Sequence, residues 1–274
     1  MGQEGNDTNP RALLLALLQA FGCDVPVQLL IKAAALFGID ENRTRVALHR
    51  LRAKSLVESH ERGTYRIEGS GGEASVLSWS QVLDRLQTWS GHWIAVHTAP
   101  LPRADKTLAR RRDRATDQVG LRELQPGLLV RPDNLRGGAA AAQREMVAHG
   151  LEPHALVYVI ASLGDADAEA RGLWSDLALE QRYKAHIERL TRLTLGVRSL
   201  EPEEAARQAF IASGEAARHL MADPLLPAPL VDPALREAFV ETLVAFDDVG
   251  RELWAKVLDT NLELRMSPTA EPTA

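Results

Sequence analysis

Residues 40–68 read DENRTRVALHRLRAKSLVESHERGTYRIE, and this stretch decides the fold of the N-terminal part of the chain. Its first half predicts a helix over 41–54, because the i, i+3, i+4, i+7 spacing puts four residues on one buried face. These residues are Thr44, Ala47, Leu48 and Leu51. Asp40 precedes them, and its carboxylate can cap the first turn. After Ser55 the period changes, so that 56–59 and 64–67 predict two strands of a hairpin.

The outward face of the helix over 41–54 is rich in cations and holds no carboxylate after Glu41. Arginine and asparagine carry forked donors that match the edges of guanine and adenine in the major groove. We therefore assign base reading to Asn42, Arg43 and Arg45, near the start of this helix. Contacts to the DNA backbone, which fix register and carry little sequence information, are assigned to His49, Arg50, Arg52 and Lys54. In the hairpin, Arg62 and Arg66 are assigned to contacts with the DNA backbone or the minor groove.

Two further helices are expected between Pro10 and Gly38, because prolines stand at their starts and glycines at their ends. Three helices followed by a hairpin is the order of a winged helix-turn-helix. We place this DNA-binding domain at residues 10–69, after a lead-in at 1–9. A glycine-rich joint at 69–72 predicts its boundary.

The rest of the chain predicts two further domains. Strands alternate with helices between 73 and 165, which indicates a central α/β domain of the ferredoxin-like kind. An acidic stretch at 165–169 is a candidate linker. Residues 170–266 are helical in pattern and predict a C-terminal domain for effector binding and dimerisation, before a flexible tail at 267–274. The expected fold class is therefore multidomain α+β.

Composition limits the function. The chain of 274 residues has a formal net charge of −5, so DNA binding requires a local concentration of cations such as the one on 41–54. Residues 1–9 lack the order of a signal peptide, and no apolar run is long enough to span a bilayer, which predicts a cytoplasmic protein. No histidine spacing typical of a metal site and no nucleotide-binding motif is present, so we expect no cofactor and no enzymatic centre.

Several motifs resemble the PaaX-like regulators, the repressor family of phenylacetic acid degradation. They occur in consistent order from about residue 11 to 260: LFGI at 36–39, RVALHRL at 45–51, Trp89 with Trp93, PGLLVRP at 126–132, Trp174 with Tyr183, and DPLLP at 223–227. The resemblance implies a winged-helix domain, a central Cas2-like domain and a helical C-terminal domain. It also implies a homodimer that binds double-stranded operator DNA, and repression of a catabolic operon relieved by an acyl-CoA such as phenylacetyl-CoA. The chain departs from the family in its hairpin, which keeps only Tyr65 of a doubled aromatic, and after DPLLP, where a tryptophan is missing.

Other interpretations stay open. Arg111 and Arg112 belong to an arginine-rich helix expected over 104–119, which is either a solvated surface, an accessory DNA contact or a clamp for the phosphates of an effector. Trp174 and Tyr183 either line an effector pocket or belong to the core. The alternative functions are a metal-dependent nuclease or an enzyme acting on acyl-CoA in the C-terminal two-thirds, and a winged helix that binds only proteins.

Overall fold

The computed structural model describes residues 9–22, 24–60, 63–67, 79–102 and 104–259. The lead-in at 1–8, the joint at 69–72, the tail at 267–274 and Arg62 lie outside these ranges. The chain forms two compact units. The first, here called the terminal unit, combines residues up to Ser80 with Glu188–Ala217 and the segment from Glu241 onward, and the second, the central unit, combines Gln81–Ile187 with Arg218–Val240.

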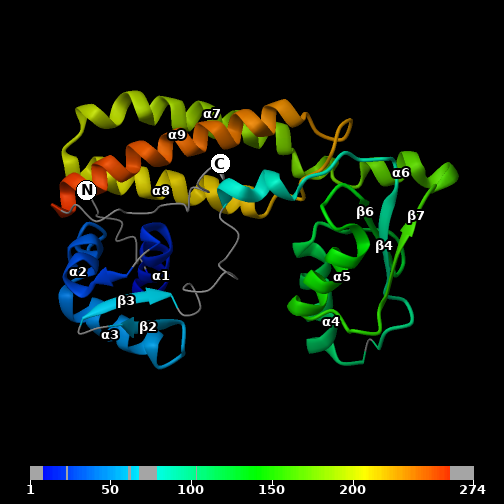
Figure 1. Cartoon of the computed structure of the whole chain (residues 1–274), viewed down its shortest axis with the longest axis horizontal. Helices are drawn as coiled ribbons and strands as arrows, with labels where there is room; N and C mark the ends of the chain where they lie inside the picture. The colour runs from blue at the N-terminus through cyan, green and yellow to red at the C-terminus, as the bar shows by residue number, and fades with distance from the viewer. Residues whose placement is uncertain (1–8, 23, 61–62, 68–78, 103, 260–274) are drawn as a thin grey trace, which may run out of the picture. The chain divides into compact units, whose positions relative to one another are not determined.

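The N-terminal part of the terminal unit consists of three short helices and a small sheet (Figure 1). Its elements are α1 (Pro10–Phe21), β1 (Val25–Pro26), α2 (Val27–Ala35), α3 (Glu41–Arg52), β2 (Val57–His60) and β3 (Thr64–Ile67). The sheet is antiparallel in the order β1-β3-β2. The expected helix over 41–54 and the expected hairpin are therefore confirmed to within two residues.

Local signals set the ends of the helices. The Asn9 side chain accepts a hydrogen bond from the backbone N–H of Arg11 at 3.1 Å, and Pro10 occupies the first turn of α1, where no N–H is needed. Gly22 ends α1 with φ of 62°, a left-handed conformation that favours glycine. Helix α2 ends at Ala35, and a turn carries the chain through Gly38 to α3.

Three long helices follow in the sequence: α7 (Leu179–Gly196), α8 (Pro202–Met221) and α9 (Pro233–Leu258). Each contributes one part to each unit. In the terminal unit, Ala206, Trp254 and Leu258 belong to the same buried cluster as the apolar residues of α1, α2 and α3. The core under the three short helices is therefore completed by residues about 200 positions later in the chain.

The central unit is built on a four-stranded antiparallel sheet. Its elements are β4 (Trp93–His97), α4 (Lys106–Gln118), β5 (Arg122–Gln125), β6 (Leu128–Pro132), α5 (Gly138–His149) and β7 (Leu156–Ile160), and the strand order is β5-β6-β4-β7. Helices α4 and α5 cover one face (Figure 1), where Ile94 and Val96 of β4 pack with Ala115, Met146 and Leu151.

The segment expected as a linker at 165–169 is part of the central unit instead. It forms a 3-10 turn, Gly164–Ala166, and the start of α6 (Asp167–Gly172). The Asp167 carboxylate accepts hydrogen bonds from Trp93 Nε1 at 3.2 Å and from Arg171 Nε at 2.6 Å. The acidic residues that suggested solvent exposure thus include one that anchors a helix to the sheet.

Two other expectations differ in detail. The region expected to alternate strands with helices has a 3-10 helix, Trp79–Arg85, ahead of β4. Strand β5 was not expected, because its four residues, RELQ, give little alternation. None of the helices in the described ranges is long and apolar enough to cross a membrane.

Candidate nucleic-acid interface

Helix α3 is oriented by its buried side. Thr44, Ala47, Leu48 and Leu51 are all buried, as the spacing predicts. The Asp40 carboxylate accepts a hydrogen bond from the backbone N–H of Arg43 at 2.8 Å, and Thr44 Oγ1 donates to the Asp40 carbonyl at 2.9 Å. This cap fixes where the helix begins and therefore which residues point outward.

Every α3 residue assigned to DNA is exposed. These residues are Asn42, Arg43, Arg45, His49, Arg50 and Arg52, and Lys54 after the helix is exposed as well. Val46 lies among them with 42% of its surface exposed, and an exposed apolar side chain suits contact with a thymine methyl group. The face therefore combines forked donors with one apolar side chain.

Arg45 has a partner that the assignment overlooked. Its Nε and Nη2 atoms both lie 2.8 Å from Glu41 Oε1, one turn earlier in α3. The i, i+4 spacing is a signal for this pair that the sequence carries. Both side chains are about half exposed, so water screens the pair and the guanidinium can exchange partners at small cost.

Cations further along α3 are not held in this way. In the described part of the chain, no carboxylate lies within ion-pair distance of Arg50, Arg52 or Lys54. They stand at the C-terminal end of the helix, where the helix dipole favours positive charge. Their charge is available to phosphate groups.

In the hairpin, Arg66 is engaged within the protein. Its Nε donates to Glu58 Oε1 at 2.6 Å, and Asp24 Oδ1 lies 3.9 Å away. Glu58 and Arg66 are directly opposite in the β2–β3 register, a pairing that follows from the hairpin itself. Two acidic groups thus share the charge of Arg66, so it is less available to DNA than the unpaired cations of α3.

The arginine-rich helix is α4, and its two candidate effector residues differ. Arg111 is exposed, whereas Arg112 is buried. Arg112 forms a close two-pronged pair with Glu152 and donates to the Pro102 carbonyl at 2.9 Å. The Glu152 carboxylate raises the pKa of Arg112, and the guanidinium lowers the pKa of Glu152. Arg112 therefore binds α4 to the segment after α5 rather than a ligand.

The two aromatic candidates for an effector pocket lie in the core of the central unit. Trp174 stacks on Trp93 at a centroid distance of 6.3 Å, and its Nε1 donates to the Gly120 carbonyl at 3.1 Å. The Tyr183 hydroxyl donates a hydrogen bond to the Asp223 carboxylate, and its ring stacks on Phe239. Burial and the Asp223 charge raise the pKa of Tyr183 above its usual range. Both side chains are buried and have partners within the protein, which favours the core over an effector pocket for these two residues.

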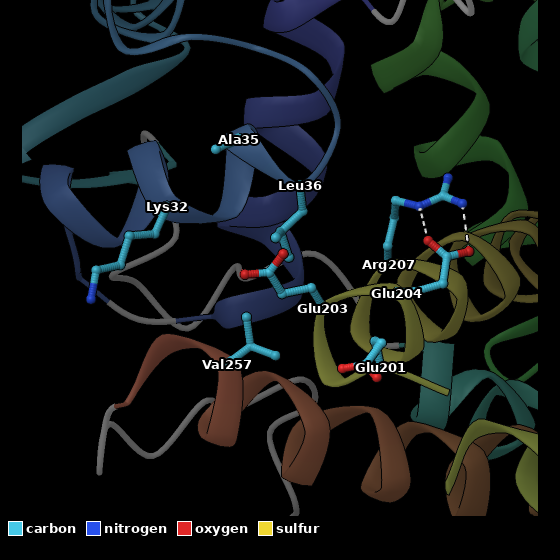
Figure 2. A pocket seen from close by; sticks show the side chains of 8 residues that line it. All are labelled: Lys32, Ala35, Leu36, Glu201, Glu203, Glu204, Arg207 and Val257. Carbon is cyan, nitrogen blue, oxygen red and sulfur yellow. Dashed lines mark hydrogen bonds and ion pairs between the residues drawn. The ribbon is translucent and has the colours of Figure 1, made fainter. Parts of the chain in front are cut away.

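A surface hollow of about 600 Å³ is present in the terminal unit (Figure 2). Its wall carries the carboxylates of Glu201, just before α8, and of Glu203 and Glu204 in the first turn of α8, with Lys32 of α2 and Leu36 just after α2. Glu204 is held by two hydrogen bonds from Arg207, at 2.7 and 2.8 Å, which lower its pKa. An anionic effector such as an acyl-CoA would meet mainly carboxylates here.

Within the described ranges, no group of three or more His, Cys, Asp or Glu side chains could hold a metal ion.

The fold is that of a multidomain α+β protein. It is similar to a solved structure of the uncharacterized protein Rv0674 from Mycobacterium tuberculosis, with a TM-score of 0.51, 24% identity, and coverage of 88% of this chain and 97% of that chain. No protein-family profile matches the sequence. No curated protein matches it either.

Proposed function

We propose that the chain is a sequence-specific DNA-binding transcriptional regulator, and that its residues 10–67 form a winged helix-turn-helix. The order α1-β1-α2-α3-β2-β3 with an antiparallel sheet supports this assignment. In such domains the helix before the hairpin enters the major groove. Here that helix is α3.

The observation that carries the proposal is the exposed face of α3. It concentrates cations in a chain whose formal net charge is −5. Arg50, Arg52 and Lys54 have no carboxylate within ion-pair distance in the described ranges, and Asn42 offers a forked amide near the helix start. A concentration of cations on one helix face suits contact with phosphate groups better than contact with a protein surface of mixed charge.

The central unit supports the rest of the architecture. Its element order β4-α4-β5-β6-α5-β7, with strand order β5-β6-β4-β7 and both helices on one face, favours a ferredoxin-like domain. The resemblance to PaaX-like regulators favours a catabolic operon as the target. An effector site is not part of the proposal, because Arg112, Trp174 and Tyr183 are engaged within the protein.

The test is an anisotropy titration of the full chain on two labelled duplexes of equal length, one from the region upstream of its gene and one of random sequence. We expect tighter binding to the upstream duplex, and affinity for both that falls steeply with salt because phosphate contacts release counterions. Arg45→Ala should weaken binding to the upstream duplex more than to the random one. Arg50→Ala should weaken both alike and reduce the salt slope by about 1.

Arg192→Ala is the matched control. Arg192 is an exposed arginine on α7 that pairs with Glu188 at i, i+4, just as Arg45 pairs with Glu41 on α3. It should leave both affinities unchanged. Absence of salt-sensitive binding to any duplex at low salt contradicts the proposal and favours a winged helix that binds proteins.

A further inference from the structure

The helix layer of the central unit carries a second group of exposed arginines. Helices α4 and α5 lie side by side over one face of the sheet (Figure 1), and a Cβ atom added at Gly150, after α5, would lie 3.2 Å from the Cβ atom of Arg111 on α4. The outer side of this layer therefore combines residues of both helices. Four exposed arginines on it, here called the arginine surface, are Arg110, Arg111 and Arg114 of α4 and Arg144 of α5.

The three arginines of α4 lie on one side of its exposed surface. Successive helix residues are turned by about 100°, so Arg110, Arg114 and Arg111 follow one another around α4 within about 100°. Arg111 is the member nearest α5, as its position beside Gly150 shows. The exposed residues between them are uncharged and can form hydrogen bonds; they are Thr107 and Gln118. This side of α4 therefore carries positive charge and no carboxylate.

The carboxylates of the helix layer lie elsewhere or are paired. Asp113 and Asp117 are further around α4, on the side away from α5. Glu145 of α5 and Glu152 after it each form an ion pair with an arginine outside the arginine surface. Over the part of the chain that the structure describes, no carboxylate lies within ion-pair distance of the four arginines. Their charges are therefore available to an anionic partner.

We propose that the arginine surface binds the phosphate backbone of the duplex that α3 binds, as a second DNA contact of the chain. This inference rests on the proposed function, because α3 brings the duplex to the chain. Arginine, threonine and glutamine side chains are among the groups that contact phosphates and sugars in protein–DNA complexes. Once α3 holds a duplex, contact by another surface of the same chain is intramolecular, so even a weak contact adds to the affinity.

A polyanion suits the arginine surface better than a small anionic ligand does. Small ligands are bound in concave pockets that cover most of their surface. The four arginines are exposed and are distributed over two helices, and Arg110 and Arg114 alone are separated by about 6 Å along the axis of α4. DNA carries one negative charge per about 1.7 Å of its axis, so one duplex can contact several of these arginines at once.

The test is an anisotropy titration of the full chain on the upstream and random duplexes at several salt concentrations. One variant, here called the triple variant, combines Arg110→Ala, Arg111→Ala and Arg114→Ala, since alanine favours the helix. Each lost phosphate contact reduces the salt slope by about 0.9, so we expect a reduction of about 2–3 and at least about tenfold weaker binding to both duplexes at low salt. The ratio of the two affinities should stay unchanged, because phosphate contacts carry little sequence information.

A matched control removes three other arginines that are exposed and lie outside both α3 and the arginine surface. It combines Arg182→Ala, Arg198→Ala and Arg218→Ala. The control changes the net charge as much as the triple variant does, so it measures the effect of net charge alone. We expect it to change the salt slope by less than about 0.5.

A crosslink tests the contact without removing any charge. In a Cys23→Ser background, Thr107→Cys labelled with a photoactivatable azide should crosslink to the bound duplex, because Thr107 lies among the arginines of α4. Gln181→Cys, at an exposed position on α7 of the same unit, should not crosslink in the same background.

The possible failures of the two proposals are distinguishable. The second DNA contact is overturned if the triple variant keeps the salt slope of its control, or if the two cysteines crosslink equally. In both cases the native chain still binds DNA, and the proposed function stands. A native chain that shows no salt-sensitive binding to any duplex contradicts both proposals.

Discussion

Arg45 and Glu41 form an ion pair along the exposed face of α3, with two guanidinium nitrogens 2.8 Å from the same carboxylate oxygen. Glu41 is the one carboxylate in a helix otherwise rich in cations. On the proposed interface it acts in two ways against DNA binding: it occupies the arginine assigned to base reading, and its charge repels phosphates. On the proposed interface, the pair should therefore lower the affinity of α3 for DNA.

We expect Glu41→Gln to bind DNA about two- to tenfold more tightly than the native chain. Releasing Arg45 from an exposed i, i+4 pair saves about 0.3–0.5 kcal/mol, and removal of a negative charge adds to this. The gain should shrink as salt rises, because screening weakens both effects. Glu188→Gln, which breaks the corresponding pair on α7, is the control. Unchanged or weaker binding of Glu41→Gln contradicts this role for Glu41.

Arg131 is a buried cation that connects three segments of the central unit. It is 1% exposed, and it donates hydrogen bonds to the Val119 and Pro132 carbonyls, to Asn134 Oδ1 at 3.0 Å and to the Pro224 carbonyl at 3.2 Å. Burial, and to a smaller degree the charge of Arg85, lower its pKa to about 10. The group therefore remains charged at neutral pH and keeps all its donors.

Arg131→Met should destabilise the chain by about 2–4 kcal/mol, because it leaves buried carbonyl oxygens without donors. Arg131→Lys should recover only part of this, since an ammonium cannot reach three segments as a planar fork does. Urea unfolding followed by tryptophan fluorescence measures both. The control is Arg136→Met, at an exposed arginine with a 3.2 Å bond to the Leu86 carbonyl, which should change stability by less than about 0.5 kcal/mol. Equal stability of Arg131→Met and the native chain would show that these hydrogen bonds do not offset the cost of burying the charge.

Asp247 predicts a pH dependence of stability. Its side chain is 4% exposed on α9, and burial raises its pKa to about 7, against a smaller opposing effect of the Arg251 charge. Unfolded, the group titrates at about 3.9. Between about pH 4 and 7 the folded chain thus holds a proton that the unfolded chain has lost, so stability falls as pH rises through this range, by up to about 4 kcal/mol, and levels off above it.

Asp247→Asn should flatten this slope and should be more stable than the native chain at pH 8. Unfolding free energies measured at half-unit intervals from pH 4 to 8 provide the check. Glu241→Gln, an exposed carboxylate earlier on α9, should keep the native slope. If the asparagine variant follows the native pH profile, Asp247 does not carry the dependence.

The sequence predicted those features that depend on near neighbours. The helical period and Asp40 located α3 and its outward face, and the change of period at Ser55 located the hairpin. Two ion pairs could have been predicted from the same signals. The i, i+4 spacing brings Glu41 and Arg45 together, and the hairpin register brings Glu58 and Arg66 together.

The partners of buried polar residues could not be predicted in this way. Arg131 donates a hydrogen bond to the carbonyl of Pro224, which is 93 residues later in the sequence. Trp174 donates one to the carbonyl of Gly120, which is 54 residues earlier. Periodicity indicates that a side chain points inward, but it does not indicate what the side chain meets there. For that reason the sequence left both a pocket and a core open for Trp174 and Tyr183. It also placed a domain boundary near residue 69, although residues of α8 and α9 complete the core of the N-terminal part.

Trp254 tests how far residues 10–69 depend on those helices. It is fully buried and makes edge-to-face contacts with Phe21 of α1 at 5.6 Å and with Phe210 of α8 at 6.0 Å. Trp254→Ala should destabilise the terminal unit by about 3–5 kcal/mol, because it leaves a large cavity under α1. Native-state hydrogen exchange should show the loss of protection in α1, α2 and α3 together.

A fragment of residues 1–80 should be affected more severely, since it lacks Ala206, Trp254 and Leu258 of the shared core. We expect it to unfold at a lower urea concentration than the same amides unfold in the full chain, with a smaller slope because less surface is buried. Trp89→Ala, in the central unit, is the control and should leave the protection of α1–α3 unchanged. Equal stability of the fragment and the full chain would mean that the three short helices and the hairpin fold as an independent domain. The contacts of Trp254 would then serve to attach that domain rather than to stabilise it.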